Sequence, residues 1–268
     1  MTTENVTSCD GTSIAFETLG SGPAVILVDG AMCSRRLGPM DSLAAELKSQ
    51  FTVYKYDRRG RNESGDTAPY AIQKEVEDLE AIIARANQPV FLFGMSSGAL
   101  LSLQAATGNA KLKRVAIYEP PFTHTQAQFD EGAAHTFKLK QLIANKKPGS
   151  AVRYFLTKML KAPLFFVLMM QFMPIWKKLT AIAHTLPYDS EISADPTLPL
   201  RLKQIKIPIF VVSGEKSVGF LRDAVDALSK LLPSHKRLQL GGQNHTVSMK
   251  LLAPHVISFF NDDELSKL

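Results

Sequence analysis

The chain has 268 residues, which suits one large domain or one domain that carries an insertion. Its apolar content of 45% is ordinary for a globular protein, and its net charge of +6 comes without the pattern of a nucleic-acid-binding module. Cys9 and Cys33 belong to no disulfide framework or metal-ligand cluster, and the first residues lack the features of a secretory signal. These observations predict a cytoplasmic protein with free thiols and no nucleic-acid partner.

Short apolar runs alternate along the chain with longer patterns of helical spacing. The predicted strands are residues 13–19, 24–28, 51–56, 90–93, 114–118, 207–212 and 237–240. The predicted helices are residues 42–48, 72–86, 99–106, 220–232 and 248–260. The run at 24–28 is continuously apolar, as in a strand buried on both faces, whereas 13–19 alternates and predicts an antiparallel edge strand. The pattern therefore predicts an α/β fold with a mostly parallel, helix-flanked central sheet.

Residues 122–200 break this alternation, because they are helix-like, rich in Met and Phe, and free of strand patterns. They predict a helical lid inserted into a core formed by residues 1–121 and 201–268, and they hold nine Lys or Arg against five acids. The uncharged stretch 163–176 has 14 residues, fewer than the roughly 20 of a membrane-spanning helix. We expect a buried or ligand-facing helix there and no stable membrane insertion, with contact to a membrane surface as the alternative.

The segment from Gly94 to Gly98 fits the pattern Gly-x-Ser-x-Gly, with Ser96 at its centre. Five residues alone are a weak signal, but a predicted strand runs into them and an apolar helix follows. This strand–turn–helix setting is typical of a nucleophile elbow, in which a sharp turn exposes a reactive serine. The sequence therefore predicts Ser96 as a nucleophile.

Further landmarks occur in order along the chain. Residues 28–30 read Val-Asp-Gly, residues 56–65 read Tyr-Asp-Arg-Arg-Gly-Arg-Asn-Glu-Ser-Gly, and residues 242–245 read Gly-Gln-Asn-His. With the elbow, these motifs resemble those of the α/β-hydrolase family from about residue 13 to residue 260. The resemblance implies an α/β-hydrolase fold with a Ser-His-acid triad, in which His245 is the general base.

The acid departs from the common family pattern, which places an aspartate in a late Gly-x-x-Asp. Here residues 214–217 read Gly-Glu-Lys-Ser. Glu119 is the favoured candidate, because it ends a predicted strand and two prolines follow it. This placement resembles pancreatic-type lipases and zearalenone-type lactone hydrolases, and the latter also carry Asp-Gly after the third strand. Glu215, Asp223 and the absence of any acid remain open.

The oxyanion hole is expected to consist of backbone amides, one from Ser97 and the other from Gly30 or Ala31. Asp29 stands beside this hole, where an ionised carboxylate would oppose a developing negative charge. We therefore expect Asp29 either to pair with Arg58 or Arg59, or to have a raised pKa.

The predicted activity is cleavage of a carboxylic ester or lactone of a small, largely apolar substrate through an acyl-enzyme. The expected substrate-binding residues are Met95, Phe165, Met169 and Trp176. No metal and no organic cofactor is expected, and a homodimer remains open. The alternatives are a small-molecule receptor or inactive relative, and a hydrolase of thioesters or carbon–carbon bonds.

Overall fold

The computed structural model describes residues 2–262, so both ends of the predicted core, residue 1 and residues 263–268, lie outside it. One sheet of eight strands has the order β1-β2-β4-β3-β5-β6-β7-β8. The strands are β1 (Glu4–Thr7), β2 (Ser13–Leu19), β3 (Ala24–Val28), β4 (Thr52–Tyr56), β5 (Val90–Met95), β6 (Leu112–Tyr118), β7 (Ile209–Gly214) and β8 (His235–Leu240). Strands β3 to β8 are parallel, and β2 pairs antiparallel with both β1 and β4. The predicted mostly parallel sheet is confirmed.

Each predicted strand overlaps an observed one, but the prediction of residues 13–19 as the edge of the sheet is wrong. The edge is β1, which pairs along the outer side of β2 with Val6 opposite Ile14. The sequence of β1, Glu-Asn-Val-Thr, contains one apolar residue and therefore no apolar run. Such a short edge strand is formed by backbone hydrogen bonds to its neighbour, and side-chain periodicity does not reveal it.

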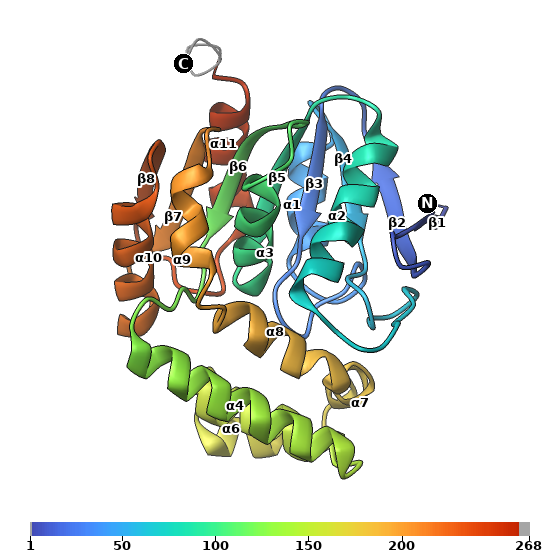
Figure 1. Cartoon of the computed structure of the whole chain (residues 1–268), viewed down its shortest axis with the longest axis vertical. Helices are drawn as coiled ribbons and strands as arrows, with labels where there is room; N and C mark the ends of the chain where they lie inside the picture. Colours follow the sequence, from blue (N-terminus) through green and yellow to red (C-terminus); the bar gives the residue numbers. More distant parts are fainter. Residues whose placement is uncertain (1, 263–268) are drawn as a thin grey trace.

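Helices cover both faces of the sheet (Figure 1). They are α1 (Met40–Leu47), α2 (Ile72–Ala86), α3 (Ser97–Ala106), α10 (Gly219–Leu231) and α11 (Met249–Phe260). Residues of β3 alternate between two apolar clusters. Ile26 belongs to the cluster that includes side chains of α2, α3 and α10, and Leu27 belongs to the cluster that includes side chains of α1 and α11. This double burial explains the continuously apolar sequence of β3.

A helical segment lies between β6 and β7, and we call it the inserted helices. It comprises α4 (Gln126–Ala144), α5 (Pro148–Tyr154), a π-helix (Phe155–Met159), α6 (Leu164–Met170), α7 (Pro174–Ala181), α8 (Leu186–Ser193) and α9 (Leu198–Arg201). Helix α8 contacts both α4 and α3, so it connects the other inserted helices to the sheet layer. Figure 1 shows α4 and α6 together at the lower end of the molecule, beyond α8.

Candidate active site

Ser96 forms the turn between β5 and α3, in a backbone conformation that L-residues rarely adopt, with φ 55° and ψ −127°. The two glycines of the motif permit this turn by letting backbones approach closely. A Cβ atom at Gly98 would lie 2.2 Å from the carbonyl oxygen of Val28, and one at Gly94 would lie 2.5 Å from the carbonyl oxygen of Gly98. The strand–turn–helix predicted around Ser96 is therefore present, and it needs glycine at both positions.

His245 lies in the loop between β8 and α11, and its Nδ1 is 2.8 Å from Oε2 of Glu119. Glu119 directly follows β6 and is fully buried. Its other oxygen, Oε1, accepts hydrogen bonds from the Gly214 amide, at 2.7 Å, and from the Ser217 hydroxyl. A carboxylate bound on both oxygens is held in place, and it can fix the ring orientation and tautomer of His245.

The structure separates the three candidate acids. Glu119 contacts His245, whereas Glu215 accepts a hydrogen bond from the Gly242 amide and Asp223 is exposed on α10. Ser217 occupies the position where the family pattern has an aspartate, and its hydroxyl donates to Glu119. The residue at this position thus supports the acid, a role that sequence reasoning missed.

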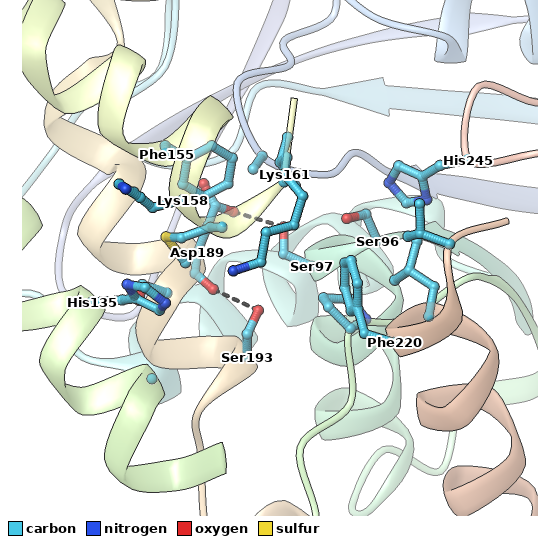
Figure 2. A pocket seen from close by; sticks show the side chains of 18 of the residues that line it. Ser96, Ser97, His135, Phe155, Lys158, Lys161, Asp189, Ser193, Phe220 and His245 are labelled. Carbon is cyan, nitrogen blue, oxygen red and sulfur yellow. Dashed lines mark hydrogen bonds between the residues drawn. The ribbon is translucent and has the colours of Figure 1, made fainter. Parts of the chain in front are cut away.

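Ser96 and His245 line the same cavity, which has a volume of about 680 Å³. Figure 2 shows them on one side, with Phe155, Lys158 and Asp189 of the inserted helices opposite. Within residues 2–262 no hydrogen bond joins Ser96 to His245 in this conformation. Catalytic contacts of this kind are often long without substrate and shorten once it binds.

The predicted oxyanion donors surround Ser96. Ser97 is the first residue of α3, so its amide has no partner within the helix. Ala31 lines the main cavity with Ser96, and both also line a second cavity of about 450 Å³ together with Gly30. A Cβ atom at Gly30 would lie 3.0 Å from the Cβ of Ser96, so this backbone packs directly against the serine.

The Asp29 side chain is buried beside this loop, and Oδ1 has no hydrogen-bond partner within the described part of the chain. Arg58 forms ion pairs with Glu75, at 2.7 Å, and Asp189, at 2.9 Å. It donates to the backbone carbonyl of Asp29 and not to its carboxylate. Arg59 pairs with Asp78, also at 2.7 Å. Burial raises the pKa of Asp29 to about 8, and the nearby arginines only partly offset that effect. Of the two expected outcomes, the burial of Asp29 favours the raised pKa over a side-chain pair with Arg58 or Arg59, so the neutral carboxyl predominates at neutral pH.

Asp189 of α8 joins the inserted helices to the loop after β4 and to the turn at Ser96, a contact absent from our predictions. Its Oδ1 accepts hydrogen bonds from the Ser97 hydroxyl at 2.7 Å, Arg61 at 2.8 Å and Arg58 at 2.9 Å. Arg61 also donates to the Gly30 carbonyl at 2.6 Å. Burial opposes ionisation of Asp189, but the two arginines and Ser97 outweigh it and lower its pKa. One signal was available, because Asp189 is the first acid after an acid-free stretch of residues 132–188.

Three of the four expected substrate-binding residues line neither cavity. Phe165 and Met169 are 74% and 54% exposed, and Trp176 packs beside Gly149. Met95 lines the second cavity. The expectation of one buried or ligand-facing helix at 163–176 is also wrong, because two helices occupy this stretch and Val167 is the one buried residue of α6. An apolar run without a polar side does not reveal which face turns inward.

Apolar lining of the main cavity comes from other segments. It is provided by Phe155, Met159 and Leu160 at the π-helix, and by Val218, Phe220 and Leu221 at the start of α10. A π-helical turn is rare and often occurs at functional sites. Sequence spacing did not distinguish these residues from ordinary packing residues.

Comparison with known proteins identifies the family of this chain. The chain is similar to an alpha/beta hydrolase from Sphaerobacter thermophilus, with 40% identity, a TM-score of 0.85, and coverage of 96% of this chain and 100% of that one. An esterase from a Rhodococcus species has the same fold at 17% identity, with a TM-score of 0.70 and coverage of 98% and 99%. An uncharacterized hydrolase, YraK of Bacillus subtilis, is 30% identical over 115 residues, so the match spans 41% of this chain and 42% of that relative. The sequence model described as "Alpha/beta hydrolase family" matches residues 29–249, and the chain therefore belongs to the alpha/beta hydrolase family.

Proposed function

We propose that this protein is a serine hydrolase that cleaves a carboxylic ester or lactone of a small, largely apolar substrate through an acyl-enzyme. The observation that carries the proposal is the 2.8 Å contact between Glu119 and His245, at a cavity that Ser96 also lines. A nucleophile, a base and a carboxylate that orients the base are the three parts that acyl transfer requires.

In the proposed mechanism, Nε2 of His245 takes the Ser96 proton while Oγ attacks the substrate carbonyl. The Glu119 carboxylate stabilises the imidazolium that forms. The Ser97 amide and the amide of Ala31 or Gly30 bind the oxyanion, each contributing roughly 3–4 kcal/mol. His245 then protonates the leaving alcohol, and it later activates the water that releases the acyl group.

The neutral state of Asp29 supports this mechanism. Its raised pKa, about 8, keeps negative charge away from the loop that would bind the oxyanion at neutral pH. Two features of the sequence favour the receptor alternative, namely the missing Gly-x-x-Asp acid and the unusual Asp29. Glu119 contacts His245 from another strand end, and burial favours the neutral form of Asp29, so both features are compatible with a hydrolase.

Labelling with a fluorophosphonate probe tests the proposal directly. We expect the parent to be labelled at Ser96, Ser96→Ala to be unlabelled, and His245→Ala to be labelled far more slowly. A folded parent that is never labelled would instead favour the receptor. Turnover on matched esters, lactones and thioesters then identifies the bond that is cleaved, and a preference for thioesters would contradict the ester assignment.

A further inference from the structure

Helix α6 and the turn after it present a large apolar surface to solvent. We call this surface the α6 face, and its residues are Leu164, Phe165, Phe166, Leu168, Met169, Phe172 and Met173. Phe172 is 92% exposed and Phe165 is 74% exposed. Single exposed apolar side chains are ordinary, but a contiguous group of this kind marks an interaction surface.

Along the chain, the charges on both sides of the α6 face have one sign. Residues 132–188 contain no Asp or Glu and nine Lys or Arg. Among these nine, within the described residues, Lys140 alone forms an ion pair, with Glu191 at 2.7 Å. Lys158 and Lys161 precede α6, and Lys177 and Lys178 lie on α7 directly after it, and all four are exposed. The apolar face is therefore flanked along the chain by free ammonium groups.

We propose that the α6 face docks this protein reversibly on an anionic lipid bilayer surface. The phenylalanine and methionine side chains would enter the headgroup region, while the flanking lysines contact lipid phosphates. Docking is interfacial, because α6 has seven residues, and no described helix combines the length and hydropathy that a membrane-spanning helix requires.

Charge argues for a lipid surface over a second copy of this chain. A two-fold symmetric contact through the α6 face would bring the same acid-free segment of both copies together. Like charges would then repel, whereas anionic lipid supplies the missing opposite charge.

The α6 face is continuous with the cavity wall. Leu160, Lys161, Ala162 and Pro163 line the main cavity, and α6 begins at the next residue. Docking would therefore bring one wall of the cavity to the lipid surface. The docking itself does not depend on chemistry at Ser96, so the two proposals can fail independently.

Co-sedimentation of the full chain with vesicles tests the proposal. We expect binding to vesicles that contain phosphatidylglycerol, and binding at least about tenfold weaker to pure phosphatidylcholine or at high salt. Equal binding to both vesicles at all salt concentrations, or binding to neither, would overturn it.

Matched variants locate the surface. The double variant Phe165→Ser, Phe172→Ser should lose affinity for anionic vesicles by on the order of tenfold or more, because it removes two apolar anchors. Phe137→Ser is the control, since Phe137 is 65% exposed on α4 outside the α6 face. Unchanged circular dichroism shows that the variants fold, and equal losses for both would contradict the assignment.

A second pair of variants tests the lysines. Lys177→Glu, Lys178→Glu should weaken binding by on the order of tenfold or more, whereas Lys111→Glu, Lys113→Glu, which makes the same charge change next to and within β6, should have a much smaller effect. Analytical ultracentrifugation gives the competing outcome. A dimer that Phe165→Ser, Phe172→Ser dissociates would assign the α6 face to a second copy and overturn lipid docking.

Discussion

The loop after β4 and the inserted helices both carry clustered positive charge, but they place it in opposite environments. Arg58, Arg59 and Arg61 are each 1% exposed, and each pairs with a buried or partly buried carboxylate. The lysines that flank α6 are exposed and unpaired within residues 2–262. A charge can be buried only when a partner compensates its lost hydration. The paired charges therefore hold the loop after β4 in place, and the unpaired charges remain available to an external partner.

Asp189 is the point at which the two regions meet. It belongs to the inserted helices by sequence, yet its carboxylate lies among Arg58, Arg61 and Ser97 of the core. Variants of core residues and of the inserted helices therefore test whether the buried, paired charges matter more to activity and stability than the exposed charges do.

The largest effect should come from Glu119, the paired carboxylate closest to the proposed chemistry. Glu119→Gln removes the charge that stabilises the His245 imidazolium, so kcat for ester hydrolysis should fall by about 10³–10⁴-fold. Steady-state kinetics measures this change. Glu215→Gln is the control and should change kcat little, because Glu215 contacts the Gly242 amide and not the imidazole. Near-equal rates for Glu119→Gln and the parent would exclude Glu119 as the triad acid.

The second-largest effect should be on the free energy of unfolding, when Asp189 is removed. Asp189→Ala leaves two buried guanidinium groups without their shared partner, so the free energy of unfolding should fall by about 3–5 kcal/mol. Urea denaturation measures it. If the loss stays below about 1 kcal/mol, the junction does not hold the inserted helices to the core.

Asp29 should make the free energy of unfolding depend on pH. Its pKa is raised to about 8 in the folded protein, so the native state keeps a proton that the unfolded chain releases near pH 4. The free energy of unfolding should therefore fall as pH rises between about 4 and 8, by at most about 1.4 kcal/mol per pH unit from this group, and then level off. Asp29→Asn should remove that slope in urea titrations at several pH values. Parallel curves for parent and variant would mean that Asp29 is ionised in the native state.

The smallest change in the free energy of unfolding should come from removing the surface ion pair between Lys140 and Glu191. The Lys140 side chain is 59% exposed, so Lys140→Met should change the free energy of unfolding by less than about 1 kcal/mol. The same urea measurement used for Asp189 gives the comparison. A loss as large as that for Asp189→Ala would show that the inserted helices depend on their exposed charges as strongly as the core depends on its buried ones.

Local patterns in the sequence predicted seven of the eight strands and the turn at Ser96. These features depend on neighbouring residues, such as a continuous apolar run or glycines at two set positions around a serine. His245 was instead implied by the resemblance to the α/β-hydrolase family. Glu119 was also identifiable, because a carboxylate at a strand end followed by two prolines is a local feature.

The partners of these residues were decided by tertiary structure. Asp189 and Arg58 are separated by 131 positions, and Ser217 and Glu119 by 98, and no periodicity relates residues so far apart. The short edge strand β1 had no apolar run, and the stretch 163–176 was apolar on every side. Sequence alone determined most of the core strands and helices and the serine turn, because these follow from local backbone preference and spacing. Tertiary packing decided which charges were paired and which apolar side chains stayed exposed. Burial of a segment depends on the parts of the chain, distant in sequence, that pack against it.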